Sequence, residues 1–383
     1  MKIARVAGNK KRLAVMLGIA MVLIFTLPAC GGSSNKGGDA PAPSEDEAAA
    51  QAPAPPANDE VYYVTAEVNY PKPEAGVITQ YFDDLTEISG GRLQFDIYYG
   101  ASLNGMNGML QALETGVIQC GGIMPCNYDA AFPYSGALFN MPFLGFEDME
   151  GASSIWLDMY NTTPEMQAEF EGEGLWVAAA MANPIYDLHL SKDINIRVPS
   201  NLRGVSILTQ EPEITEVVNK IGGAAVVAEP ADFYQKLDNN IASGVVQQIN
   251  TITSLGVSPD LIKKHIRFDE GGGFTTSILT YVWRQNYLDS LPHELQGIIY
   301  QRSATLGEEM LENDSAIVAA NWEKAEAAGS ESVFLTRDEV QAWDDVAKPI
   351  TLDALNARAA QGADNILDVY DKLTGRIGEY YGK

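Results

Sequence analysis

The three histidines of this chain are the first residues to consider for acid–base chemistry or metal binding. His189, His265 and His293 are widely separated, and the sequence contains no HExxH, GxSxG or P-loop motif. No nucleophile therefore has a recognisable base beside it, although distant residues converge in a folded chain. The sequence predicts a protein that is not an enzyme and has no cofactor or metal.

Two cysteines in the interior of the chain offer redox chemistry. Cys120 and Cys126 are separated by five residues of sequence GGIMP, and without a nearby histidine this spacing is a poor metal signature. In an exported protein the two thiols can form a disulfide, which in so small a loop contributes about 2.4 kcal/mol in the chain-entropy argument. We favour this bridge, and two unpaired buried thiols are the alternative.

A carboxylate within a strand pattern is a candidate partner for a bound ligand. Asp187 lies in the apolar segment 185–190, between Tyr186 and His189. A buried carboxylate must be paired or hydrogen bonded, and Asp187 and His189 project to the same side of an extended strand. We expect these two side chains to face a pocket, and a solvated outer face of the sheet is the alternative.

The N-terminal segment has the pattern of an export signal. Five basic residues and no acids precede the apolar run Leu13–Leu27, whose length of ~15 residues is too short to span a bilayer. The run ends in the sequence LPACG, which resembles the lipobox of bacterial lipoproteins. The resemblance implies that residues 1–29 are a lipoprotein signal peptide and that Cys30 carries the lipid. An ordinary signal peptide with an incidental cysteine is the alternative.

The segment after Cys30 has the composition of a linker. Residues 31–60 consist largely of Gly, Ser, Ala, Pro and acids and contain no aromatic side chain. Such a segment cannot bury enough apolar surface to offset its ordering entropy, so we predict a disordered tether over residues 30–60. A lipid anchor followed by a tether predicts an extracytoplasmic protein held at a bacterial membrane, either in the periplasm or at the cell surface.

The charge of the chain excludes one class of partner. The formal net charge is −26 at pH 7, and removal of the basic signal peptide makes the mature chain more acidic still. Nucleic acids are bound by concentrated Lys and Arg side chains. We therefore expect no nucleic acid among the partners.

The elements that must position these residues alternate between strand and helix. Strand patterns at 61–68, 92–99 and 117–124 enclose helical periods at 75–89 and 106–114, which is the βαβαβ succession of a parallel sheet. A second alternation follows, in which strand 185–190 continues strand 175–181 and further strands and helices occupy 205–208, 213–221, 224–228, 233–242 and 245–249. This pattern predicts a second α/β domain.

The last third of the chain is mainly helical. Helical periods run from 292 to about 328 and from 336 to 381, with Pro349 expected to break the second. Before them, Gly271, Gly272 and Gly273 separate two strand patterns. Three glycines can absorb a backbone rotation, so this position is a candidate hinge, with a simple loop as the alternative.

A series of segments points to a family. In order they are GGRLQFDIYYGASL, QALETGVIQCGG, LFNMPFLGFEDME, VPSNLRGVSI, IGGAAVVAEPADFYQKLDNNIASGVVQQIN and YLDSLPHELQGII. Their strand ends, Pro-Phe-Leu loop and Leu-Pro-x-Glu-x-Gln helix start resemble those of the DctP-like solute-binding proteins of tripartite ATP-independent periplasmic (TRAP) transporters. The resemblance extends from Val61 to about Ala328, and it rests on the order of the segments rather than on a single motif.

The resemblance implies a fold like that of periplasmic binding proteins, with two α/β domains, hinge strands, a long bracing helix and C-terminal helices. It places domain I at 61–184 plus 274–313, domain II at 185–273 plus 314–345, and the C-terminal helices at 346–383. It also implies that a small organic solute binds in the interdomain cleft and that the closed receptor delivers it to the membrane permease subunits. A cleft buries a small ligand well, and closure is a population shift toward the state that the ligand contacts on both sides.

Several positions depart from the pattern of this family. Most members hold a carboxylate with an Arg that directly follows a strand, because a guanidinium binds a carboxylate bidentately. Leu208 occupies this position here, and Asp187 stands near the position of a second Arg. Gln111 and Gln247 stand where the family has acids. The usual Arg–carboxylate clamp is therefore not expected.

These departures leave three classes of ligand open. An amine or other cation would be held by Asp187 and by the aromatic faces of Tyr186, Tyr234 and Trp283. The plainer interpretation of Tyr186 and Trp283 is that they are core aromatics. This class of ligand therefore depends mainly on Asp187.

The other two classes use different side chains. A neutral polar ligand would be held by Gln111, Gln247 and Asn250, and the family places a cleft loop at Asn69. A carboxylate would need Arg197 or another relocated Arg. A solute-binding lipoprotein of an ABC-type importer is the closest alternative function, because its architecture is similar.

Overall fold

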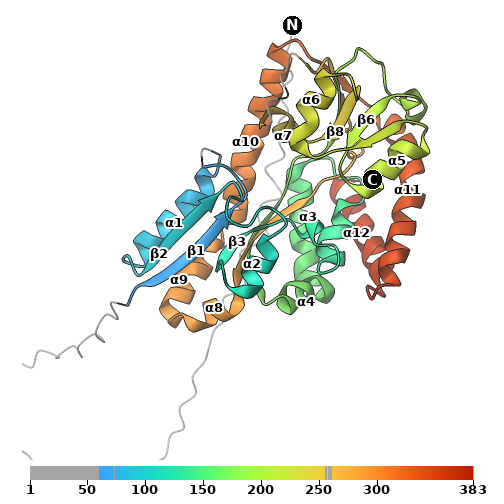
Figure 1. The fold of residues 1–383 in the computed structure, drawn as a ribbon. Helices are drawn as coiled ribbons and strands as arrows, with labels where there is room; N and C mark the ends of the chain where they lie inside the picture. The colour runs from blue at the N-terminus through green and yellow to red at the C-terminus, as the bar shows by residue number, and fades with distance from the viewer. Residues whose placement is uncertain (1–59, 73, 255–256, 258–260, 383) are drawn as a thin grey trace, which may run out of the picture. The chain divides into compact units, whose positions relative to one another are not determined.

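The strands of the protein form two sheets in a mixed α/β architecture (Figure 1), as predicted. The computed structural model describes residues 60–72, 74–254, 257 and 261–382 of the chain. The predicted signal peptide, Cys30 and nearly all of the tether lie outside these residues. Within the described part, no helix is long and apolar enough to cross a membrane.

The first sheet has the strand order β2-β1-β3-β10-β4. Its strands are β1 (Tyr62–Val68), β2 (Leu93–Tyr99), β3 (Cys120–Ile123), β4 (Leu175–Ala182) and β10 (Ile278–Arg284). β1 pairs in parallel with β2 and β3, and β10 is antiparallel to β3 and β4. The crossover helices are α1 (Gly76–Ile88) and α2 (Met109–Thr115). The predicted βαβαβ start of the chain is thus confirmed.

Helices pack on both faces of this sheet through apolar stripes. In α1 the buried residues Ile78, Tyr81, Phe82 and Leu85 recur at helical spacing, which turns one face of the helix toward the sheet. The same core contains residues of α8 (Gln285–Ser290), α9 (His293–Ser303) and α10 (Leu306–Ala327). A separate core on the sheet unites α2, α3 (Met149–Thr162), α4 (Pro164–Gly172) and α12 (Ile366–Tyr381).

The second sheet has the strand order β11-β9-β5-β8-β6-β7. Its strands are β5 (Asp187–Leu190), β6 (Ser206–Thr209), β7 (Ala224–Val227), β8 (Gly244–Gln247), β9 (Lys264–Arg267) and β11 (Glu331–Phe334). Its core contains residues of α5 (Pro212–Lys220) and α11 (Arg337–Ala359), and a smaller cluster joins it to α6 (Phe233–Asp238) and α7 (Ile249–Ser254). Short 3₁₀ or π turns lie at Pro125–Asn127, Pro133–Ala137, Leu138–Asn140, Pro199–Leu202 and Pro230–Asp232.

Two extended segments cross side by side between the sheets. Residues 183–186 lead from β4 to β5, and residues 268–277 lead from β9 to β10. Backbone hydrogen bonds join them, from Asn183 N to Ser277 O (2.8 Å) and from Tyr186 N to Thr275 O (2.9 Å). The prediction that strand 185–190 continues strand 175–181 is therefore wrong, because β4 and β5 belong to different sheets. The predicted domain boundaries themselves stay a prediction.

Helix α10 makes a third connection between the sheets. It packs against α1 and β4 at the first sheet and against α7 at the second (Figure 1). Asn321 of α10 donates a hydrogen bond to Asn250 Oδ1 of α7 at 2.8 Å. The structure thus contains the long bracing helix that the family resemblance implies.

The C-terminal helices differ from the prediction at Pro349, which lies inside α11 and does not break it. A proline inside a helix removes one backbone hydrogen bond and crowds the preceding turn. Trp343, Ala347 and Ile350 of the same helix are buried in the core of the second sheet. This packing on both sides of the proline holds α11 in one piece.

The three consecutive glycines are required by close packing. Gly271 and Gly272 have φ values of +118° and +97°, a region that other residues rarely adopt. A Cβ on Gly272 would lie 2.5 Å from Gly145 Cα. This segment is therefore fitted against a neighbouring loop, and its role as a hinge stays a prediction.

Candidate ligand-binding cleft

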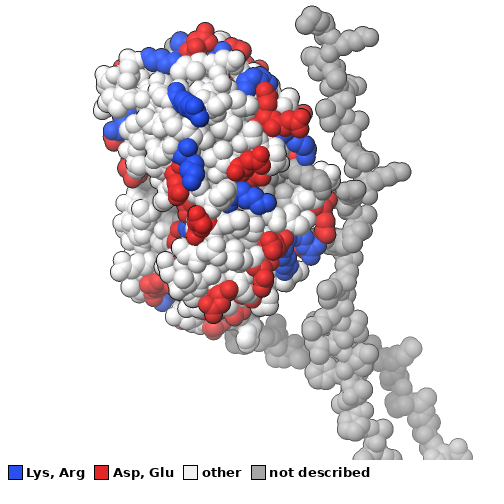
Figure 2. Space-filling view, turned by 90° about the vertical axis from the view of Figure 1, so that its right-hand side faces the viewer, with Lys and Arg blue, Asp and Glu red and all other residues white. Residues whose placement is uncertain are grey.

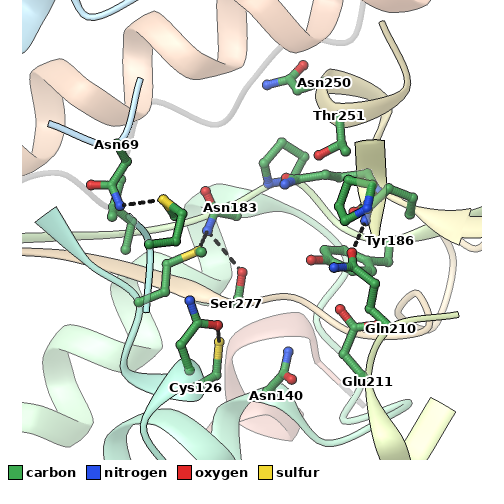
Figure 3. A pocket seen from close by; sticks show the side chains of 18 of the residues that line it. Asn69, Cys126, Asn140, Asn183, Tyr186, Gln210, Glu211, Asn250, Thr251 and Ser277 are labelled. Carbon is green, nitrogen blue, oxygen red and sulfur yellow. Dashed lines mark hydrogen bonds between the residues drawn. The ribbon is translucent and has the colours of Figure 1, made fainter. Parts of the chain in front are cut away.

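A cavity of about 1170 Å³ is lined by the carboxyl ends of strands from both sheets and by the two crossing segments. Asn69 follows β1, Met124 follows β3, Gln210 follows β6 and Gln247 ends β8. In Figure 3, Asn69 lies on one side of the cavity and Gln210 on the other. The carboxyl ends of parallel strands are where α/β proteins commonly bind ligands.

The crossing segments form the middle of the cavity wall. Asn183 Nδ2 donates to Ser277 Oγ at 2.9 Å and approaches the sulfur of Met124 at 3.6 Å. Figure 3 shows Asn183 and Ser277 between Asn69 and Tyr186. A ligand in this cavity therefore contacts both crossing segments.

The wall at the second sheet is rich in amides. Gln247 Nε2 donates to Gln210 Oε1 at 2.8 Å, and Gln247 Oε1 accepts from the backbone N–H of Gln248 at 2.9 Å. Asn250 contributes from the first turn of α7, held by Asn321. Neutral hydrogen-bonding groups thus face the cavity from β8 and α7.

The two cationic side chains that line the described cavity are Lys324 and Arg358. Arg358 Nη2 lies 2.7 Å from Asp129 Oδ2 and 3.0 Å from Glu213 Oε1. This guanidinium therefore already forms ion pairs with two carboxylates of the protein. Lys324 Nζ lies 3.5 Å from Asn321 Oδ1.

Glu211 is the carboxylate at the N-cap of α5, beside Tyr186 (Figure 3). Burial raises the pKa of Glu211 to about 7, although hydrogen bonds from the backbone N–H groups of Gln210 and Glu211 and from Tyr186 oppose the shift. Burial also raises the pKa of the Tyr186 phenol well above its usual value, with the charge of Glu211 adding to the shift. Tyr186 is thus a neutral hydrogen-bonding group at physiological pH.

Of the nine predicted ligand-binding residues, four line the cavity: Asn69, Tyr186, Gln247 and Asn250. The other five do not. Trp283 is buried in the core of the first sheet and donates to the Tyr81 hydroxyl at 3.2 Å. Leu208 is buried in the cluster beneath α6 and α7. Gln111 and Tyr234 are exposed on their helices and are not among the residues that line the cavity.

Asp187 is also absent from the cavity wall, and its partners are within the protein. Its Oδ1 accepts from the backbone N–H of Phe268 at 3.1 Å, and its Oδ2 lies 3.2 Å from Arg267 Nε. Burial raises the pKa of Asp187 to about 7, against the attraction of Arg267. Arg197, the predicted relocated cation, pairs with Glu339 outside the cavity. The structure thus gives both residues partners within the protein, and a role of either in ligand binding stays a prediction.

His189 and His265 form a buried pair behind this wall. Their Nδ1 atoms are 2.6 Å apart, and His189 Nε2 lies 2.8 Å from Gln247 O. Because a backbone carbonyl only accepts, His189 carries its proton on Nε2 and accepts from His265 at Nδ1. Burial lowers the pKa of His189 well below its usual value and that of His265 to about 4. Both rings are therefore neutral at pH 7.

The predicted disulfide is wrong for this structure, in which Cys120 and Cys126 are both free. Cys120 begins β3, and an extended strand advances ~3.3 Å per residue. Ile123, at the end of the strand, is therefore about 10 Å from Cys120, and a disulfide would need the chain to return to within ~7 Å between Cα atoms. Cys126 lies further on, in the turn Pro125–Asn127 at the cavity.

The sequence analysis missed several residues that line the cavity. Glu211 follows β6 by two positions, and Asn183 lies between β4 and β5. Polar residues just after a strand are a usable signal for such a site. Arg358 belongs to the C-terminal helices, which the sequence analysis set apart from both domains, and nothing local connects it with the cavity.

A two-sheet α/β fold with a large cavity at strand ends and paired crossing segments defines a periplasmic-type binding protein. The sequence of residues 67–357 matches the bacterial extracellular solute-binding protein family 7, also called DctP. The chain therefore belongs to this family, whose members are solute receptors of TRAP transporters that work with membrane permease subunits. No curated protein sequence matches the chain significantly.

Solved structures of TRAP solute-binding proteins share the fold. One from Ochrobactrum anthropi has a TM-score of 0.74 and 17% identity, covering 85% of this chain and 97% of that one. One from a marine metagenome, in complex with 3-hydroxybenzoate, has a TM-score of 0.72 and 16% identity, covering 84% and 99%. One from Rhodoferax ferrireducens, with copurified benzoate, has a TM-score of 0.69 and 20% identity, covering 84% and 99%. At these identities the likeness is one of fold.

Proposed function

We propose that this protein captures a small organic solute in the cleft and delivers it to the permease of a TRAP transporter, without the usual Arg–carboxylate clamp. The absence of this clamp is supported by the ion pairs of Arg358, whose guanidinium already contacts the carboxylates of Asp129 and Glu213. Leu208, at the position of the family's Arg, is buried in a hydrophobic cluster. The cleft thus lacks a free guanidinium among the residues that the structure describes.

The test is a thermal-shift screen of the mature protein with amines, polyols and carboxylates. A solute that binds the folded state raises the melting temperature in proportion to the logarithm of its concentration. Gln210→Ala removes a hydrogen-bonding group of the cleft and is expected to reduce the shift, whereas the matched variant Gln111→Ala, on an exposed helix, is expected to retain it. A screen across these classes without a stabilising solute would refute the receptor function.

We also propose that the receptor is exported and held at the membrane by a lipid on Cys30, with residues 31–60 as its tether. A short linker between an anchor and a binding domain keeps the domain near its permease. Cys30→Ala is expected to release the protein from the membrane fraction and to abolish labelling with a radioactive fatty acid. Unchanged fractionation and labelling would contradict the anchor without affecting the cleft. Genes for one small and one large membrane subunit beside this gene, without an ATPase, would distinguish a TRAP system from an ABC importer.

A further inference from the structure

The buried polar atoms of the cleft that lack a partner are all acceptors. Asn69 Oδ1, Glu211 Oε2 and Gln248 Oε1 are shielded from solvent and have no hydrogen-bond partner among the described residues. Buried acceptors without donors are rare in proteins and call for an explanation. A ligand that offers N–H groups is one, since it would supply the missing donors.

The charges of the cleft also favour a ligand that donates hydrogen bonds. Lys324 and Arg358 are the cations of the described lining. The carboxylates that line it are Glu74, Asp129, Glu211, Glu213, Glu229 and Asp314. Of these, Asp129 and Glu213 share the single positive charge of Arg358. On the face shown in Figure 2, acidic and basic side chains are interspersed.

Glu211 is one of the carboxylates of this lining that have no cationic partner. No ion pair involves it among the described residues, and its side chain lies beside the aromatic ring of Tyr186 (Figure 3). Glu211 lines the cavity, so a charged group of a ligand can approach its carboxylate. An anionic ligand at this place would meet a buried like charge, whereas a cation would remove the cost of ionising it.

We propose, resting on the receptor function above, that the solute carries a protonated amine and that Glu211 is its counter-ion, with the Tyr186 ring beside the ammonium group. A charge-assisted hydrogen bond at a partly buried site is worth about ten- to hundred-fold in affinity. An aromatic face adds to the attraction of a cation. The amides of Gln210 and Asn140 are left for the neutral part of the solute.

Two sets of matched probes test the charge of the solute. The first set is benzylamine, benzyl alcohol and benzoate. The second set is putrescine, 1,4-butanediol and succinate. Isothermal titration with the mature protein at pH 7.5 is expected to give the amine the lowest Kd of at least one set, at least tenfold below that of the carboxylate. A carboxylate or a diol as the tightest binder would overturn the proposal and leave the receptor function intact. Absence of binding by both amines would also overturn it, and the broad screen above then decides on the receptor function.

Variants at two carboxylates test the residue. Glu211→Gln keeps the shape of the side chain. It is expected to raise the Kd of the amine by about ten- to hundred-fold and to have little effect on the Kd of the alcohol. Glu74→Gln, an exposed carboxylate that also lines the cleft, is expected to change the Kd of the amine by less than about threefold, because exposed ion pairs are weak. Equal losses in both variants, or none in Glu211→Gln, would overturn the assignment. Melting temperatures without probe show that each variant is folded.

Proton release gives an independent readout. Burial raises the pKa of Glu211 to about 7, so an ammonium that drives its ionisation releases about half a proton at pH 7. The other groups that face it are Tyr186, Cys126, Glu213, Asp129 and Arg358. Burial raises the pKa of Cys126 to about 12 and that of Tyr186 well above its usual value. Asp129 and Glu213 are both paired with Arg358. The binding enthalpies measured in phosphate and in Tris are expected to differ by the heat of transferring this proton to the buffer. A Glu211→Gln variant that still releases the proton would refute the role.

Discussion

The substitution Asp187→Asn tests whether Asp187 has a structural role or binds the ligand. The variant keeps an oxygen for the Phe268 N–H and loses only the charge that faces Arg267. Because Asp187 does not line the cleft, we expect the Kd of the solute to change by less than about threefold, the scale of a surface effect. The effect is expected instead in the stability of the fold and in its dependence on pH.

The magnitude follows from the two ionisation states of Asp187. Burial raises its pKa to about 7 in the folded protein, whereas an unfolded aspartate titrates near ~3.9. Between these values the unfolded chain has released its proton and the folded protein has not, so the free energy of unfolding falls as the pH rises. At ~1.4 kcal/mol per pH unit, the interval from pH 5 to pH 7 amounts to about 3 kcal/mol.

Urea unfolding of both proteins at several pH values measures this term. The other titrating groups are common to wild type and variant, so they cancel in the difference. At pH 5 the two are expected to agree within about 1 kcal/mol, because Asp187 is then mostly protonated in the folded wild type. By pH 7 to 8 the variant is expected to have gained about 3 kcal/mol relative to wild type.

The matched control is Asp269→Asn, because Asp269 also pairs with Arg267 but is 43% exposed. An exposed pair contributes about 0–1 kcal/mol, so this variant is expected to show no such trend with pH. A difference between Asp187→Asn and wild type that is constant from pH 5 to pH 8 would refute the reasoning on stability. A large loss of solute affinity in Asp187→Asn would restore the original prediction that Asp187 is the ligand's counter-ion.

Two further substitutions test other contacts by urea unfolding. Arg358→Met leaves the carboxylates of Asp129 and Glu213 without their shared cation, and we expect a loss of about 1–3 kcal/mol. Gly272→Ala forces a residue with a Cβ into φ +97° and places that Cβ 2.5 Å from a facing backbone atom, so we expect a loss of at least about 2 kcal/mol. Gly375→Ala, in an open helical position, is expected to stabilise the protein by about 0.5–1 kcal/mol.

The control for the arginine is Arg376→Met. Arg376 also pairs with two carboxylates, Asp158 and Glu379, but its side chain is 41% exposed. Exposed pairs contribute about 0–1 kcal/mol. Equal losses in Arg358→Met and Arg376→Met would show that burial adds nothing to the first pair, and a harmless Gly272→Ala would show that its loop is loosely packed.

Local patterns predicted most of the fold because its helices and strands have clear periods. The strand and helix order at the start of the chain and in the second sheet was found in this way. The division between β4 and β5 was missed, because their separation depends on hydrogen bonds from Asn183 and Tyr186 to residues some ninety positions later. Strand β11 was missed for the same reason, since its four residues gain their partner only in β9.

The cleft was harder to predict because one position along an extended chain changes the face of the sheet. Tyr186, Leu188 and Leu190 belong to the core with α5 and α11. Asp187 and His189 instead face Arg267 and His265 on the opposite side. A shift of one residue in the comparison with the family would therefore exchange Asp187 for Tyr186, which does line the cavity. Arg358 depends on how distant elements meet, which no local pattern contains, whereas the position of Glu211 just after β6 is a local signal.

The bracing helix α10 also gives the receptor an optical reporter. Asn321 holds the cleft residue Asn250, and the next residue, Trp322, packs its indole against His265 and 3.7 Å from the guanidinium of Arg267. A solute that displaces Asn250 therefore changes the surroundings of an adjacent fluorophore. Subtracting the emission of a Trp322→Phe variant isolates this signal, so occupancy can be followed without a label on the protein or on the solute.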